Sequence, residues 1–138
     1  MSARTKGASV SASTPWGGAY TIENGAINRP YCWGAATYTY DHWFQYTFNT
    51  VVPVVEVQTQ GCKGISYRTL TYSLKCSQDG VNWTSVEGGK IYNGNTDSDT
   101  IVTNKLASPV YCKALRIYPV SAASNWPALR SEVIILDN

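Results

Sequence analysis

The sequence predicts an all-β fold made of antiparallel strands, and three observations support this. The chain is rich in Thr, Ser and Tyr, with 10 Tyr against 2 Phe and 1 Met, and such residues favour strands and turns over helices. Turn signals such as Asp79-Gly80 and Asn93-Gly94-Asn95 recur at short intervals. The segments between them alternate apolar and polar residues, which is typical of strands with one buried face. We therefore expect an antiparallel sandwich or barrel.

Five segments carry the strand pattern most clearly: 42–48, 54–59, 70–77, 111–118 and 131–136. In the third, Leu70, Tyr72, Leu74 and Cys76 alternate with polar residues, so we expect these four side chains to share one buried face. Pro53 has no amide hydrogen for a ladder hydrogen bond. We expect the second strand to begin after it or to lie at a sheet edge.

Composition narrows the class of protein further. A length of 138 residues and a mass of 15.1 kDa predict a single domain over residues 1–138. The composition excludes a coiled coil, a helical bundle and a disordered chain. No stretch approaches the roughly 18 apolar residues of a membrane span. The net charge of +2, from 11 basic and 9 acidic residues, is too balanced for a nucleic-acid partner, which needs a clustered basic face.

The four cysteines, at positions 32, 62, 76 and 112, do not have the spacing of zinc ligands, and the chain holds one His. Two disulfides or four buried thiols remain. The start of the chain shows no apolar signal region. The protein therefore stays inside the cell, has lost its signal, or leaves by another route.

The sequence offers little support for a catalytic site or a metal site. His42 stands beside Asp41, but adjacent strand residues point to opposite faces, so we expect a histidine at a loop end. The chain has neither a nucleophile motif nor an evident pair of opposed carboxylates, and we expect no enzyme. Oxygen-bearing side chains alternate from Asn93 to Asp99, but the glutamate that closes an EF-hand loop is missing. We expect a turn there instead of a calcium site.

Six motifs in order resemble the discoidin family, also called the coagulation factor V/VIII type C domain. The resemblance runs from Trp33 onward, over about three-quarters of the chain. The matching segments are Trp43 to Phe48 with Trp33 before it, Val55 to Gly61, Tyr72 to Trp83, Tyr92 to Asp97, Ala114 to Pro119 and Ala128 to Val133. The resemblance implies an eight-stranded antiparallel jelly-roll-like β-sandwich that acts as a binding module and not as an enzyme.

The resemblance also bears on metal and cysteines. Related carbohydrate-binding modules often hold calcium in a loop that matches Ala26 to Trp33, but Asn28 replaces the acid and Arg29 adds a positive charge. We therefore expect no cofactor. Cys32 and Cys62 resemble a pair in retinoschisin, which implies a Cys32–Cys62 disulfide. Cys76 and Cys112 have no such match, and because Cys112 is out of phase with Leu115 and Ile117 we expect this pair to be free and buried.

In the resembling domains, loops at one end of the barrel hold the ligand. They correspond here to residues 14–25, 34–42 and 62–68. The candidate ligand-binding residues on them are Trp16, Tyr20, Tyr38, Asp41, Lys63, Ile65, Tyr67 and Arg68. Trp and Tyr suit both the apolar face of a sugar and a membrane interface. The set has one strong aliphatic residue and two basic residues beside acidic ones, which favours a glycan over anionic phospholipid.

The function that follows is a discoidin-like lectin or adhesion domain that binds a cell-surface glycan or glycoprotein. The alternatives are a peripheral membrane module for anionic phospholipid and a protein–protein adhesion module that uses the same loops. This assignment implies an extracellular or cell-surface location. Arg116, Arg130 and Glu132 are expected in a paired, partly buried network, with a direct ligand role for Arg130 as the alternative. Trp83 is expected to cap the core. Asn82-Trp83-Thr84 is a formal N-glycosylation sequon.

Overall fold

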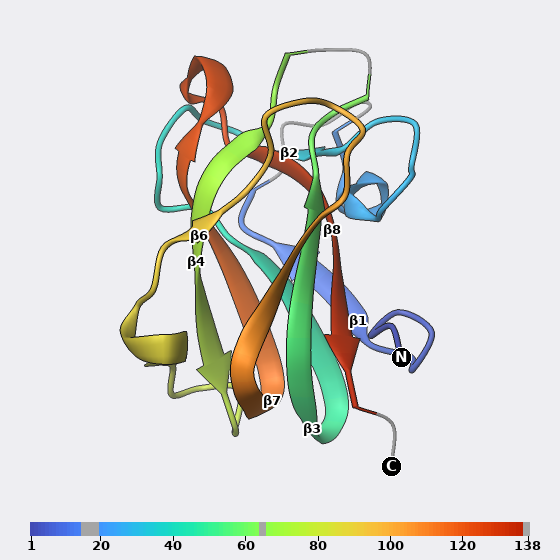
Figure 1. Cartoon of the computed structure of the whole chain (residues 1–138), viewed down its shortest axis with the longest axis vertical. Coiled ribbons are helices and arrows are strands. Elements are labelled where there is room, and N and C mark those ends of the chain that lie inside the picture. The colour runs from blue at the N-terminus through green and yellow to red at the C-terminus, as the bar shows by residue number, and fades with distance from the viewer. Residues whose placement is uncertain (15–19, 64–65, 137–138) are drawn as a thin grey trace.

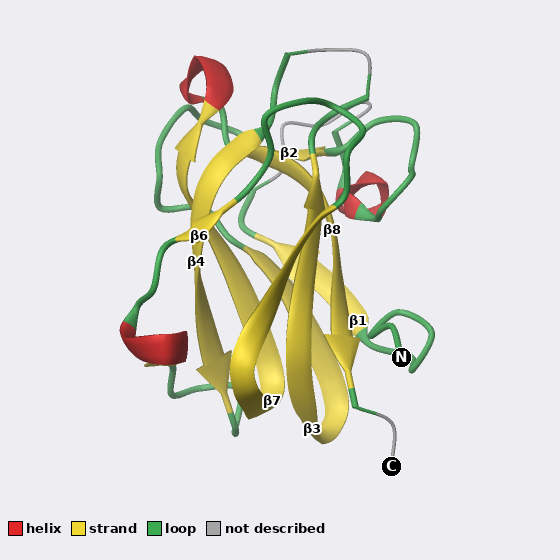
Figure 2. Cartoon of the chain, viewed as in Figure 1, coloured by secondary structure: helices red, strands yellow, loops and turns green. Residues whose placement is uncertain are grey.

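A computed structural model describes residues 1–14, 20–63 and 66–136 of the chain. It consists of eight strands, all paired antiparallel, with three short 3-10 helices and no α-helix among these residues (Figures 1 and 2). This confirms the all-β antiparallel prediction. The described residues contain no helix long and apolar enough to span a membrane. The strands are β1 (Ser9–Ala12), β2 (Trp33–Gly34), β3 (Phe44–Gln60), β4 (Thr69–Ser77), β5 (Thr84–Ser85), β6 (Tyr92–Asn93), β7 (Val102–Ala122) and β8 (Ala128–Ile135). The 3-10 helices are η1 (Ile22–Gly25), η2 (Val86–Gly88) and η3 (Ala123–Asn125).

Two long strands, β3 and β7, bend at the lower end of Figure 1 and so take part in both layers of the sandwich. The first half of β3 pairs with β1 and with the second half of β7, which also pairs with β4. The second half of β3 pairs with β8 and with the first half of β7. The predicted strands 42–48 and 54–59 are thus two arms of one 17-residue strand.

Pro53 lies inside β3, just past the bend, so the expectation that a strand starts after it or runs at an edge was wrong. The pairing of β3 with β7 shifts register between Thr47 and Val52, and the pairing with β8 begins only at Val54. The Pro53 carbonyl still accepts a hydrogen bond from the Leu136 amide (2.9 Å). The bend therefore accommodates a residue that would interrupt a regular ladder.

The core between the layers is built from aromatic and aliphatic side chains, including the fully buried Trp33, Phe44 and Leu115. In β4, Tyr72, Leu74 and Cys76 are buried as the alternation predicts, but Leu70 is exposed. The register of β4 against β7 shifts between residues 69 and 72, and this reverses the side-chain phase. Thr69 is buried instead of Leu70, and its hydroxyl donates to the Ala128 carbonyl (2.8 Å).

The chain holds two disulfides. Cys32–Cys62 confirms the pairing that the family resemblance implied. Cys76–Cys112, with Cα atoms 5.5 Å apart, corrects the expectation of two free thiols. Ala114 and Leu115 are consecutive buried residues in β7, so the alternation changes phase there and Cys112 faces the same interior as Leu115. A strict alternation of buried and exposed residues, extended back from Ile117, does not predict this change of phase.

The expected charge network is only partly present. Within the described part of the chain, Arg116 forms no ion pair with an acid. Its guanidinium lies between the indole rings of Trp43 and Trp83, 3.9 and 4.1 Å from their centroids, in a cation–π arrangement. Trp83 is half-buried and stacks on this arginine instead of capping the core. Glu132 pairs with Arg4 at 3.8 Å.

Candidate ligand-binding site at the loop end

Four aromatic side chains form a cup at the end of the sandwich opposite the bends of β3 and β7. Tyr20, Tyr38, Tyr67 and Trp126 line a shallow cavity of about 120 Å³. Tyr20 and Tyr67 meet Trp126 edge-on, with ring centroids 4.9 and 4.5 Å from the indole, and Tyr38 lies tilted at 6.4 Å. Each ring comes from a different loop, so the fold brings together residues that are remote in the chain. We call this group the aromatic cup.

Trp126 forms the base of the aromatic cup. Its indole nitrogen donates to the Ala35 carbonyl (2.6 Å), and the side chain is 3% exposed. Gly34 passes so close to the indole that a Cβ there would overlap the ring. Trp126 is not among the candidate residues that the sequence suggested. The available signal was a large aromatic residue two positions before the Ala128 to Val133 motif.

The Cys32–Cys62 disulfide supports the cup from below. Both sulfurs are fully buried and pack in one cluster with Trp126 and Ala128, against which Tyr20 and Tyr67 also pack. The Cys62 amide donates to the Tyr67 carbonyl (2.9 Å). The disulfide therefore holds the chain segment that carries Tyr67.

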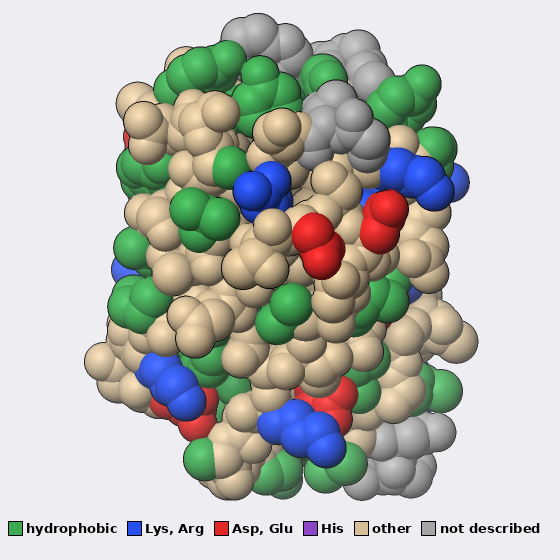
Figure 3. Space-filling model, turned by 45° about the horizontal axis from the view of Figure 1, so that its top comes forward, with side chains coloured by type: hydrophobic (Ala, Val, Ile, Leu, Met, Phe, Trp, Pro, Cys, Tyr) green, Lys and Arg blue, Asp and Glu red, His purple; other side chains and the backbone are tan. Residues whose placement is uncertain are grey.

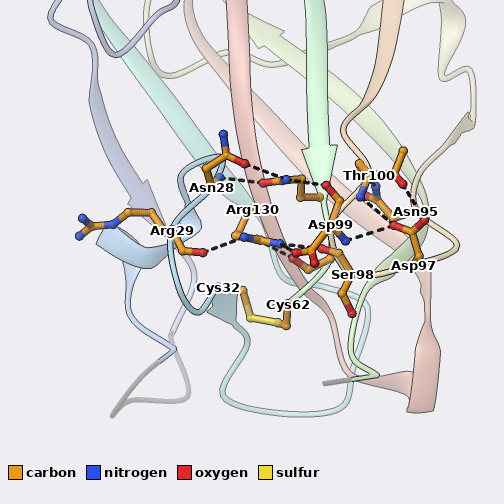
Figure 4. A network of polar contacts seen from close by, with 12 residues as sticks. Asn28, Arg29, Cys32, Cys62, Asn95, Asp97, Ser98, Asp99, Thr100 and Arg130 are labelled. Carbon is orange, nitrogen blue, oxygen red and sulfur yellow. Dashed lines mark hydrogen bonds and ion pairs between the residues drawn. A yellow bond between two sulfur atoms is a disulfide. The ribbon is translucent and has the colours of Figure 1, made fainter. Parts of the chain in front are cut away.

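Arg130 of β8 connects the loop that carries Tyr67 to two further loops beside the disulfide (Figure 4). Its guanidinium is 1% exposed and donates to the carbonyls of Gly61 (2.7 Å), Arg29 (2.7 Å) and Ser98 (2.6 Å). It also meets the Asp99 carboxylate at 3.2 Å. Each of the three guanidinium nitrogens thus donates to a backbone carbonyl. A buried charge bonded in this way holds loops together, so we interpret Arg130 as a structural residue and not as a ligand contact.

The loops that the sequence offered as metal sites use their oxygens internally. The Asp97 carboxylate accepts hydrogen bonds from the Thr100 hydroxyl (2.6 Å) and from the amides of Asp99 and Thr100. These bonds hold the pKa of Asp97 below its ordinary 3.8, led by the Thr100 hydroxyl. The Asn28 side chain pairs with Gln60 (3.1 Å). Across the described ranges, no three acidic, His or Cys side chains gather as metal ligands would.

The remaining candidate residues that the structure describes do not line the cup, and they differ in exposure. Lys63 is exposed. Arg68 is half-buried and donates to the Ser66 carbonyl (2.8 Å). Asp41 is exposed, and the Thr39 hydroxyl (2.6 Å) leads the contacts that lower its pKa. Trp16 and Ile65 lie outside the described residues. Figure 3 shows hydrophobic side chains gathered at this end, with acidic and basic ones interspersed below them.

His42 is the buried anchor of the loop that carries Tyr38. One ring nitrogen, Nδ1, lies 3.0 Å from the Ser13 hydroxyl, and Nε2 lies 2.7 Å from the Thr37 hydroxyl. Asp41 is farther, at 3.9 Å. Ser13 also accepts from the Trp43 amide (2.9 Å), so its oxygen is held in the structure. This arrangement fixes a loop end.

Comparisons with known proteins agree with the motifs and the fold. The model of the F5/8 type C domain matches residues 8–133. Coagulation factor VIII of Canis lupus familiaris is 38% identical over 100 residues, which are 69% of this chain and 4% of factor VIII. The chain thus spans a small part of that relative.

Two solved structures share the fold. Recombinant discoidin II of Dictyostelium discoideum matches with a TM-score of 0.93 at 22% identity, over 100% of this chain and 59% of that one. A module of Clostridium perfringens, in complex with GalNAc-β-1,3-galactose, matches with a TM-score of 0.75 at 13% identity, over 97% of this chain and 99% of that one. On the family match, the identity to factor VIII and the shared motifs, this chain belongs to the F5/8 type C, or discoidin, domain family of binding modules.

Proposed function

We propose that this chain is a non-catalytic lectin or adhesion module that binds a cell-surface glycan in the aromatic cup. The observation that carries the proposal is the convergence of Tyr20, Tyr38, Tyr67 and Trp126 on one shallow cavity. Aromatic rings offer a flat apolar surface to the C–H face of a sugar, and tyrosine hydroxyls add polar contacts at its edge. Loops on a rigid scaffold are a usual place for binding residues.

The size of the cup supports a sugar unit over a larger apolar ligand. At about 30 Å³ of liquid volume per water, a cavity of about 120 Å³ holds roughly four waters. A cavity of this size accommodates one sugar ring, and the rest of a glycan would lie over the loops. The Clostridium perfringens module of the same fold was solved with a disaccharide.

The charges around the cup argue against anionic phospholipid as the main ligand. Each basic residue near an anionic membrane contributes about 1 kcal/mol. Arg68 already donates to Ser66, and its charge helps to lower the pKa of Asp97. Lys63 is then the basic residue of these loops left for lipid, opposed by the exposed Asp41. The acidic oxygen of Asp41 suits a sugar hydroxyl better than a phosphate.

The structural ties below the cup favour rigid, preformed binding. Cys32–Cys62, Arg130 and His42 fix the loops before a ligand arrives, which lowers the ordering entropy that binding must overcome. Two disulfides also fit an oxidising, extracellular or cell-surface compartment.

A glycan array with the labelled protein and two tyrosine variants tests the proposal. Tyr38 is 54% exposed, so Tyr38→Ala removes a wall of the cup without disturbing the core. Tyr31, 50% exposed and outside the cup lining, provides the matched control. We expect a defined glycan signal that Tyr38→Ala weakens about tenfold or more and Tyr31→Ala retains.

Further measurements with the same protein distinguish a glycan ligand from the alternative ligands. The signal should persist in EDTA, since the Asn28 loop is expected to need no metal. Trp16→Ala should also abolish it, which would add Trp16 to the site. A blank array, with sedimentation on phosphatidylserine but not phosphatidylcholine vesicles, would replace the glycan with anionic phospholipid. A signal that Tyr38→Ala leaves unchanged would remove the cup from the site.

A further inference from the structure

A second cavity lies at the other end of the sandwich, far from the aromatic cup. Its walls are the β4–β5 turn, η2 and the bend of β7, which lie toward the lower end of Figure 1. It has a volume of about 570 Å³, several times that of the cup and within the usual range of small-molecule sites. We call it the lower cleft. Neither the family motifs nor the proposed function accounts for it.

The walls of the lower cleft are held from both sides. The Cys76–Cys112 disulfide joins β4 to β7 at the cleft. On one wall, the Asp79 carboxylate accepts hydrogen bonds from the amides of Val81 and Asn82 (both 2.8 Å). On the other, Glu87 accepts from the Ala107 amide (2.9 Å) and from the Tyr92 hydroxyl. The cleft is therefore preformed and does not depend on a ligand to open it.

The polar groups that face the cleft are suited to hydroxyl groups. Thr84 and Ser85 are exposed, and neither hydroxyl has an intramolecular partner among the described residues. Gln78 adds a side-chain amide with one weak bond, to the Tyr111 carbonyl at 3.4 Å. Tyr111, which is 56% exposed, lies in the same lining beside Pro109 and Val110. One exposed aromatic residue and several polar side chains in the same lining match a saccharide, which has an apolar face and a hydroxyl edge.

The charge of the lining decides which saccharides fit. Asp79 and Glu87 are its two charged residues, and no Lys or Arg lines the cleft among the described residues. Hydrogen bonds from Asn82 and Val81 lower the pKa of Asp79, and one from Tyr92 lowers that of Glu87, so both are ionised at neutral pH. An acidic sugar would meet these two negative charges in the lining, while Lys90, whose charge helps to lower the pKa of Glu87, lies outside the lining. For a neutral sugar, the same two carboxylates are hydrogen-bond acceptors for its hydroxyl groups.

We propose that the lower cleft is a second binding site, selective for a neutral saccharide unit, with Tyr111 as its stacking platform and Thr84, Ser85 and Gln78 as its polar contacts. The aromatic cup and the lower cleft lie toward opposite ends of the sandwich. One chain would then bridge two glycans without forming an oligomer, and bridging raises avidity when both sites engage. The proposal stands independently of the cup.

Residue-resolved NMR on the full chain tests it. The protein is made in bacteria, so that Asn82 carries no glycan, and is titrated with lactose, N-acetyllactosamine, chitobiose and mannobiose. The negatively charged comparison ligand is 3′-sialyllactose. We expect a neutral sugar to shift the amides of Thr84, Ser85 and Tyr111, and sialyllactose to shift them at least about tenfold more weakly, as unfavourable charge placement implies.

Two variants separate the sites. Tyr111→Ala should weaken the shifts at the lower cleft about tenfold and leave those at Tyr20 and Tyr67 intact. Tyr38→Ala should do the reverse. Thr84→Arg, at an exposed position, fills the cleft and should abolish neutral-sugar shifts there. If all four neutral sugars leave these amides unmoved at millimolar concentration, or if CaCl₂ alone moves them, the proposal is overturned, whatever the cup does.

Discussion

Replacement of Arg130 by Met should destabilise the protein strongly, whereas removal of its acidic partner should not. Methionine is similar in length and apolar, so Arg130→Met keeps much of the packing but removes three hydrogen bonds to the carbonyls of Gly61, Arg29 and Ser98. Hydrogen bonds that involve a charged group contribute about 1.5–3 kcal/mol each. The cost of burying the guanidinium in the parent offsets part of this sum. We therefore expect a net loss of about 3–5 kcal/mol.

Asp99→Ala is the matched variant. The Asp99 side chain is 67% exposed and meets Arg130 at 3.2 Å, so solvent screens the pair. Exposed ion pairs contribute about 0–1 kcal/mol. The carbonyl hydrogen bonds of Arg130 remain in this variant. We therefore expect a loss below about 1 kcal/mol.

Urea unfolding followed by tryptophan fluorescence measures both losses. Hydrogen exchange should also show faster opening of residues 28–32 and 61–63 in Arg130→Met, because these segments lose their common tie. Glycan affinity should fall with it, since the same segments support the cup. If Asp99→Ala destabilises as much as Arg130→Met, the ion pair carries the effect and the reasoning fails. It also fails if Arg130→Met leaves stability within about 1 kcal/mol of the parent.

Three further outcomes follow from the same structure. Gly34→Ala should cost about 1–3 kcal/mol in urea unfolding, because its Cβ would overlap the Trp126 ring; an unchanged near-ultraviolet spectrum would show that the contact is looser. Replacing both Cys76 and Cys112 by Ala should cost about 4 kcal/mol in the chain-entropy model for a separation of 36 residues, and a Tm equal to the parent's would mean that the bridge does not form. The pKa of Asp79 lies below its ordinary 3.8 in the folded state. Its stabilisation is therefore complete above about pH 4 and is lost as pH falls through the lowered value. Asp79→Asn should lose stability near neutral pH and respond less to acid in pH-stepped urea midpoints, and an acid response identical to the parent's would contradict this.

Much of the fold follows from the local pattern of apolar and polar residues along the chain. Alternation of apolar and polar residues places Tyr72, Leu74 and Cys76 inward because successive strand residues point to opposite faces, and this holds in β4. The alternation fails at Leu70 and Cys112, where register shifts and consecutive buried residues change the phase. Such irregularities depend on the neighbouring strand, which a single segment of sequence does not specify.

For the candidate site, too, some features follow from the sequence and others only from the tertiary structure. The sequence by itself determined the all-β class, the family, the loops that carry Tyr20, Tyr38 and Tyr67, and, through resemblance, the Cys32–Cys62 bridge. Only the tertiary structure decided that these rings converge on Trp126 and that Arg130 faces carbonyls instead of a ligand. The physical reason is that local propensity sets which way a side chain points along its own segment. Burial and contact are set by segments 30 to 100 residues away in the chain, as the separation of 91 residues between the Trp126 indole and the Ala35 carbonyl illustrates.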